Sequence, residues 1–206
     1  ELGLYITING GDRWSKFTKN VPPVAIHYIE LQSQTNDLVM GTHGRGVIII
    51  DDISPLREIN EDNLSNKLYF FERDQFEIQE FGGFSDSFGR ETQFFGANPS
   101  LSCEIQYLLP KRHTFGKMTM EIQDMDGNKI TTLNPGKSKG INTVNWSYNM
   151  RTPKIAKAKT LSFGGFTSPT VPAGDYKVVI KKGRDTFEKV INVAYKNNAG
   201  LSDDDR

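Results

Sequence analysis

The sequence predicts an all-β protein, and three observations support this fold class. Apolar residues alternate with polar residues at a period of two in several runs. Turn-forming Gly, Asp, Asn and Pro residues separate these runs. No stretch of ten or more residues has the 3.6-residue apolar period of an amphipathic helix. The chain has 206 residues, which is enough for one large or two small domains.

Residues 1–59 are predicted to form the first domain, a four-stranded antiparallel sheet. The four predicted strands are residues 4–8, 25–31, 37–42 and 47–51. The last of them contains Val47, Ile48, Ile49 and Ile50 and is apolar on both faces, so we expect both faces to be covered. One small sheet cannot cover both of its own faces. A neighbouring sheet outside this chain, or the second domain, is therefore expected to lie against it.

Residues 60–100 are predicted to be a linker and an aromatic, glycine-rich connection. The linker is the polar stretch 60–66. The glycine-rich loop of the connection, residues 81–95, contains five phenylalanines, at positions 81, 84, 88, 94 and 95. If they are buried, they hold the loop against a domain. If Phe84 and Phe88 are exposed, the loop is instead a binding module for a glycan or a protein.

Residues 101–195 are predicted to be a β-sandwich. Alternation is clearest in residues 101–109, and it recurs in residues 118–122, 144–148 and 176–180. Two hairpin turns are expected, at Asp126-Gly127 and at Lys182-Gly183. The final segment, 196–206, is polar, ends in three consecutive aspartates and an arginine, and is predicted to be a disordered tail.

Charge and composition set limits on the partners. The chain has 25 basic and 25 acidic residues, so the overall balance gives no electrostatic footprint for nucleic acid or for an anionic membrane. No run of about 18 apolar residues occurs, so no membrane span is expected. The single cysteine, Cys103, excludes an intrachain disulfide, and its place on the apolar face of a strand indicates a core residue. No cofactor is expected.

Residues 7–14 are predicted to form a structural turn. Thr7 and Asn9 are short polar side chains that can bond turn amides, Gly11 tolerates positive φ, and Trp14 is expected to fill the gap beneath the turn. This segment resembles the Asp-box turn of BNR-repeat propellers. Asn9 stands where the usual Asp would be, and Arg13 stands where Ser or Thr is usual. The turn chemistry explains every residue, so we expect no catalysis here.

A second motif strengthens this resemblance. The segment Thr42-His43-Gly44-Arg45-Gly46 is followed by Asp-Asp-Ile-Ser-Pro-Leu-Arg at residues 51–57. Together with the opening turn, it resembles the last blade of bacterial sortilin-like, "glycosyl hydrolase-like" BNR proteins. The resemblance implies that residues 1–59 are part of a β-propeller that stacks against remaining blades in a parent protein. It also implies an extracytoplasmic location, whether periplasmic, cell-surface or secreted.

His43 and Arg45 are the candidate ligand contacts. In a propeller they would face the central channel, where they could bind a carboxylate or a sugar. The alternative is a tight turn in which Arg45 bonds backbone carbonyls. The turn is favoured because no acid or nucleophile lies nearby in the sequence.

Three segments of the predicted sandwich, residues 122–130, 140–146 and 171–176, resemble the immunoglobulin-like module of flagellar hook-capping proteins. The acidic segment around Asp124 and Asp126 also suggests a calcium loop. Glycine is fourth rather than sixth in that loop, however, so a hairpin turn is favoured and no metal site is expected.

The predicted function is a non-catalytic C-terminal accessory region of a secreted multidomain BNR-repeat protein. Packing would be its main role, with protein or glycan binding as a further one. The alternative is that the parent is a sialidase-like glycoside hydrolase whose active site lies mainly in other blades, with His43 and Arg45 contributing to the pocket. No catalytic residue is assigned to this chain.

Overall fold

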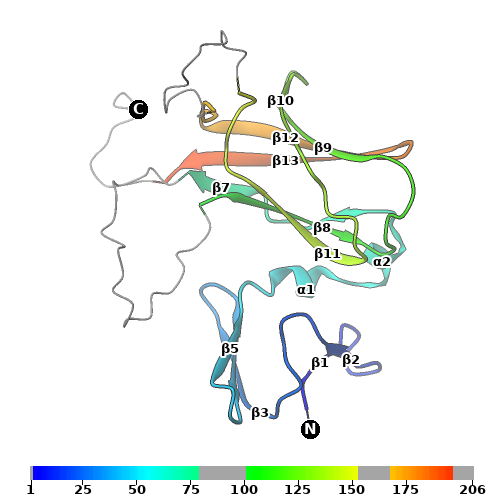
Figure 1. The fold of residues 1–206 in the computed structure, drawn as a ribbon, viewed down its shortest axis with the longest axis vertical. Coiled ribbons are helices and arrows are strands. Elements are labelled where there is room, and N and C mark those ends of the chain that lie inside the picture. Colours follow the sequence, from blue (N-terminus) through cyan, green and yellow to red (C-terminus); the bar gives the residue numbers. More distant parts are fainter. Residues whose placement is uncertain (1, 79–100, 153–167, 197–206) are drawn as a thin grey trace, which may run out of the picture. The chain divides into compact units, whose positions relative to one another are not determined.

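The computed structural model describes residues 2–78, 101–152 and 168–196, and it confirms the all-β fold class (Figure 1). Only two short helices occur in the described residues, α1 (Ser54–Glu58) and α2 (Glu61–Ser65). The chain divides into two compact units. The first is residues 1–71 with 108–111 and 139–141, and the second is the rest. The predicted Phe-rich binding loop with Phe84 and Phe88, and the predicted tail from residue 197, lie outside the described residues.

The first unit contains the four predicted strands, but they do not form one four-stranded sheet. A three-stranded antiparallel sheet has the order β3-β4-β5, and a separate pair is formed by β1 and β2. The strands are β1 (Leu4–Ile6), β2 (Ser15–Phe17), β3 (Ile26–Gln32), β4 (Asp37–Thr42) and β5 (Val47–Ile50). The turn after Ile6 folds the chain back, so β2 pairs with β1, and the isolated bridge Leu2–Ala25 joins this segment to the start of β3.

The core of the first unit lies on one face of the three-stranded sheet. Leu4, Val21 and Met40 are buried together at its centre. Partly buried apolar side chains from all five strands surround them, namely Ile6, Phe17, Ile26, Leu38, Ile48 and Ile50. Side chains alternate between the two faces of a strand, so this core uses only every second residue of β4 and β5.

The segment predicted to be a linker and connection contains regular structure. Asn60 caps α2, because its side-chain oxygen accepts a 2.8 Å hydrogen bond from the Asn63 amide. Two strands follow, β6 (Tyr69–Phe70) and β7 (Gln75–Ile78). Strand β7 pairs in parallel with β13, so the large sheet of the second unit begins well before residue 101.

The second unit is built on a five-stranded sheet with the order β10-β9-β12-β13-β7. A three-stranded sheet has the order β11-β8-β6. The further strands are β8 (Cys103–Leu109), β9 (Met118–Gln123), β10 (Lys129–Leu133), β11 (Gly140–Trp146), β12 (Gly174–Lys182) and β13 (Asp185–Tyr195). Both predicted hairpins are present, and their turn glycines, Gly127 and Gly183, have positive φ angles of 87° and 64°.

Aromatic side chains connect the two sheets in the core of the second unit. The ring centroids of Trp146 on β11 and Tyr176 on β12 lie 5.6 Å apart in a T-shaped arrangement, and Figure 1 shows these strands in different layers. The indole Nε1 of Trp146 donates a 3.1 Å hydrogen bond to the carbonyl of Asn149. The alternation predicted for β8 is confirmed, because Cys103 and Ile105 are buried.

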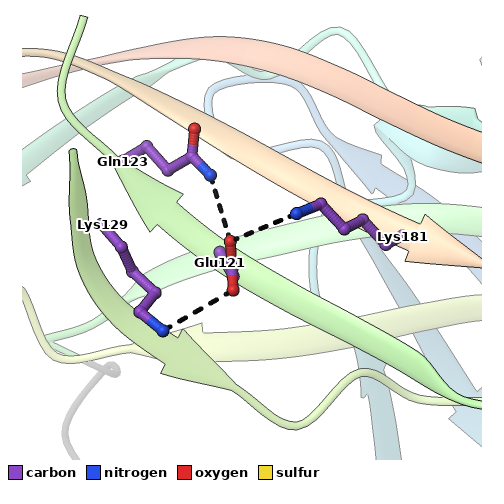
Figure 2. A network of polar contacts seen from close by, with 4 residues as sticks. All are labelled: Glu121, Gln123, Lys129 and Lys181. Atoms are coloured by element: carbon purple, nitrogen blue, oxygen red, sulfur yellow. Dashed lines mark hydrogen bonds and ion pairs between the residues drawn. The ribbon is translucent and has the colours of Figure 1, made fainter. Parts of the chain in front are cut away.

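The outer face of the large sheet has a small polar network (Figure 2). Glu121 on β9 accepts a 3.1 Å hydrogen bond from the Gln123 amide group. The ammonium groups of Lys129 and Lys181, on the two neighbouring strands, each lie 3.8 Å from a Glu121 carboxylate oxygen. Both lysines are about half exposed, so each pair contributes at most about 1 kcal/mol. The network bridges three strands but does not resemble a catalytic carboxylate site.

Candidate functional site

The turn at residues 7–14 is organised by Thr7 and Asn9. The Thr7 hydroxyl accepts a 3.0 Å hydrogen bond from the Gly11 amide and donates one to Asn9 Oδ1, also at 3.0 Å. The same Asn9 oxygen accepts a 3.0 Å hydrogen bond from the Arg13 amide. Trp14 differs from the expectation. It is 60% exposed and fills no gap, because nothing in the described part of the chain covers it.

The turn at residues 42–46 carries the two candidate ligand contacts, His43 and Arg45. It is closed by a 3.0 Å hydrogen bond from the Thr42 amide to the Gly46 carbonyl, and the Thr42 hydroxyl donates to the same oxygen at 2.6 Å. The His43 ring stacks on the ring of His27, with centroids 5.5 Å apart and planes within 17°. His43, Arg45 and His27 are all exposed.

His27 and His43 lie apart in the sequence, and the pairing of β3 with β4 brings them together. Two stacked imidazoles can share one metal ion only weakly, since structural sites usually need four ligands. In the described residues, no group of three or more His, Cys, Asp or Glu side chains lies close enough to hold a metal ion. The geometry at His43 is that of a surface turn whose imidazole stacks on His27.

The clearest surface feature of the first unit is an uncovered apolar face of the three-stranded sheet. Strand pairing places Tyr28, Gly41 and Val47 in one row, with Glu30, Val39 and Ile49 in the next. Tyr28 is 81% exposed, Val47 is 64% exposed and Ile49 is 56% exposed. We call Tyr28, Val39, Val47 and Ile49 the bare face. Within the part of the chain that the structure describes, the expectation that β5 is covered on both faces is therefore met on only one side.

The free edge of the same sheet is also apolar. Strand β5 is the last strand in the order β3-β4-β5, so its outer backbone groups have no partner strand in that sheet. Edge strands are normally protected from pairing by Lys, Pro or a bulge. Strand β5 is Val-Ile-Ile-Ile and has none of these. The exposed face and the free edge of β5 thus both have the apolar, unprotected composition that is typical of a strand inside a sheet.

The buried ionisable groups of the second unit are structural. Burial raises the pKa of the Cys103 thiol to about 12, so this thiol is not an activated nucleophile. Burial also raises the pKa of Tyr148 to about 12. The Tyr148 hydroxyl donates a 3.2 Å hydrogen bond to the Glu77 carbonyl, which ties the end of β11 to β7.

A cavity of about 400 Å³ lies beside β7 and β13 in the second unit. Arg73, Phe76 and Asn192 are among the residues that line it. The Arg73 guanidinium lies over the Phe76 ring, 5.2 Å from its centre. The Asn192 amide group donates a 2.7 Å hydrogen bond to Asp175. These polar groups serve the packing of the sheet, so the cavity by itself suggests no ligand.

Comparison with known proteins adds no further assignment. No family model, no curated protein and no solved structure matches the chain. Among the described residues, no helix is long and apolar enough to cross a membrane.

Proposed function

We propose that the chain is a structural and binding region of a larger β-rich protein, in which the first unit stacks its bare face on a neighbouring β-sheet. The observation that carries the proposal is the exposure of Tyr28, Val47 and Ile49 on one face of a three-stranded sheet. A soluble domain rarely leaves such an apolar face uncovered unless it is an interaction surface.

The energetics favour this arrangement. Full burial of one Val or Ile side chain is worth about 1.5–3 kcal/mol. Covering Val47, Ile49 and Tyr28 with a second sheet therefore contributes several times that amount. Sheets pack face to face at a separation of about 10 Å, where apolar side chains from both faces interdigitate. A small sheet that has a core on just one of its faces gains much of its stability from such a neighbour.

The sequence resemblance supports a more specific version of the proposal. The hydrogen bonds of Asn9 and the tight turn at residues 42–46 are compatible with a BNR-repeat propeller blade. On this reading, the neighbouring sheets are the remaining blades of a secreted multidomain protein, and the facing sheets of the second unit are an immunoglobulin-like module. Glycan or protein binding is a further role, and no catalytic residue is assigned.

Hydroxyl-radical footprinting of Tyr28 tests the proposal. We expect Tyr28 to react rapidly in this chain and to be strongly protected in the full-length protein that contains it. Tyr5, which is half exposed on β1, is the reference tyrosine in the same unit. Equal reactivity of Tyr28 in both forms would show that no sheet covers the bare face.

A double substitution tests the same proposal independently, through the free energy of unfolding. Val47→Thr with Ile49→Thr keeps the β-branched shape but removes apolar surface. It should change the free energy of unfolding of the isolated chain by less than about 0.5 kcal/mol, and destabilise the full-length protein by about 2 kcal/mol or more. Val190→Thr, at a half-exposed position on β13, is the matched control. A small effect in both forms would contradict the proposal.

A further inference from the structure

Three loops of the second unit meet at one end of the five-stranded sheet. Strand β9 begins at Met118, which pairs with Lys182 at the end of β12. Strand β10 ends at Leu133, which pairs with Met120 near the start of β9. The segments 112–117, 134–138 and 182–185 therefore lie at the same end. We call these three segments the basic loops.

Hydrogen bonds between backbones hold the basic loops together. The His113 amide donates a 3.0 Å hydrogen bond to the Lys137 carbonyl. The Gly183 amide donates one of 3.3 Å to the Lys117 carbonyl. The three loops are thus one surface at one end of the five-stranded sheet, where 112–117 leads into β9, 134–138 follows β10, and 182–185 joins β12 to β13.

This surface is strongly cationic. The basic loops contain five basic residues, Arg112, Lys117, Lys137, Lys182 and Arg184, and one acidic residue, Asp185. Arg112, Lys117, Lys137 and Arg184 are exposed. The chain as a whole has 25 basic and 25 acidic residues, so its net charge does not reveal the local excess of basic residues. The surface charge is concentrated here by the fold.

Phe115 lies among these cations, in the longest of the three loops. It is 88% exposed, more than any other large apolar side chain in the described residues. The loop is shaped by Gly116, whose φ is +89°, and the Gly116 carbonyl lies 3.3 Å from Nε2 of His113. The loop therefore holds the Phe115 ring exposed to solvent in a defined conformation, and the ring does not pack in the core.

We infer that the basic loops bind an anionic lipid bilayer, with Phe115 inserted at the interface and the surrounding Arg and Lys side chains at the level of the headgroups. Apolar insertion and attraction to anionic lipids are the two contributions that bind peripheral proteins to membranes. Thr114 and Gly116, the direct neighbours of Phe115, carry no charge that would oppose insertion. This inference concerns the second unit and does not depend on the stacking proposed for the first.

The loops fit a bilayer better than a nucleic acid. Proteins that bind single strands stack successive bases on several aromatic side chains along a basic groove. Phe115 is the only Phe, Tyr or Trp in the basic loops. A single protruding phenyl ring that cannot form conventional hydrogen bonds, surrounded by cations, instead matches the apolar-to-charged gradient of a membrane interface.

Vesicle co-sedimentation tests the inference on the full 206-residue chain. The chain should bind vesicles of phosphatidylcholine with phosphatidylglycerol, bind much less to phosphatidylcholine alone, and lose affinity as salt rises. Phe115→Ala should weaken binding about tenfold, and Arg112→Gln with Lys137→Gln by at least as much. Met125→Ala and Lys177→Gln, near the opposite end of the sheet, should leave it unchanged.

Two further measurements test whether the Phe115→Ala variant folds and whether the ring at position 115 enters the bilayer. Circular dichroism should show that Phe115→Ala folds normally, because the ring is exposed. In Phe115→Trp, the added tryptophan fluorescence should shift to shorter wavelength with the anionic vesicles. Absence of vesicle binding, or equal binding to both lipid compositions, would overturn the inference. It would also be overturned if Phe115→Ala bound vesicles as tightly as the parent, or if the chain bound an oligodeoxynucleotide in preference to vesicles.

Discussion

The hydroxyl group of Tyr107 donates a 2.6 Å hydrogen bond to the carbonyl oxygen of Gly136. Tyr107 is fully buried on β8, and burial raises its pKa, so the hydroxyl remains a neutral donor. Gly136 lies against the Asn142 side chain, where a Cβ atom would clash. Asn142 in turn accepts a 3.2 Å hydrogen bond from the Ser138 amide. These contacts fix the loop that carries Lys137.

Replacing Tyr107 by Phe keeps the ring and removes the hydrogen bond to Gly136. The free energy of unfolding should fall by about 1–2 kcal/mol, because the Gly136 carbonyl loses its partner in a partly buried site. Urea denaturation followed by circular dichroism measures the change. Tyr5→Phe is the control, since Tyr5 is half exposed, and it should shift the midpoint little. Equal shifts in the two variants would contradict the anchoring role.

Asn9 should be replaceable by Asp but not by Ala. Asn9 Oδ1 accepts hydrogen bonds from the Arg13 amide and the Thr7 hydroxyl, both at 3.0 Å, and a carboxylate can accept both. Asn9→Ala should speed hydrogen exchange of the Arg13 amide about fivefold, since a hydrogen bond of about 1 kcal/mol is lost. Asn9→Asp should preserve the slow exchange. Asp12→Ala, in the same turn, is the control, and an equal effect there would argue against Asn9 as the organising residue.

The strands and hairpins could be predicted because their signals are local. Alternation at residues 118–122 and 176–180 specifies strands β9 and β12, and Gly127 and Gly183 specify their turns. The hydrogen bonds of Asn9 follow from the same local chemistry. A short polar side chain beside turn glycines bonds readily to nearby amides of the same turn.

Features that depend on distant parts of the chain could not be predicted. The pairing of β1 with β2 replaces the expected four-stranded sheet, because the geometry of one turn decides which strand β1 meets. Strand β7 pairs in parallel with β13, which lies far from it in the sequence. No local pattern near residue 75 predicts this pairing. Likewise, the apolar residues of β5 predict burial but not that Val47 and Ile49 are left uncovered.

Cys103 should be inert to thiol reagents in the folded protein. Burial raises the pKa of its thiol to about 12, so little reactive thiolate is present at mildly alkaline pH, and the side chain is fully buried. Labelling with a chromogenic disulfide should be slow in buffer and fast in denaturant. The labelling rate in buffer should follow local opening of β8. Rapid labelling of the native chain would show that β8 is accessible to solvent.

Asp124 should make the stability of the β9–β10 hairpin depend on pH in the acidic range. Its carboxylate accepts hydrogen bonds from the Asn128 side chain at 2.9 Å and the Asn128 amide at 2.8 Å, and these lower its pKa below the ordinary value of 3.8. A lowered pKa in the folded state means that the stabilisation is fully present above the unfolded value. It is lost as the pH falls through the folded value.

Asp124→Asn should therefore lower the Tm near neutral pH, and the difference from the parent should shrink as the pH falls below about 4. Asp126→Asn makes the same charge change in the same turn and is the control. A Tm difference for Asp124→Asn that stays constant down to strongly acidic pH would rule out the carboxylate as its source.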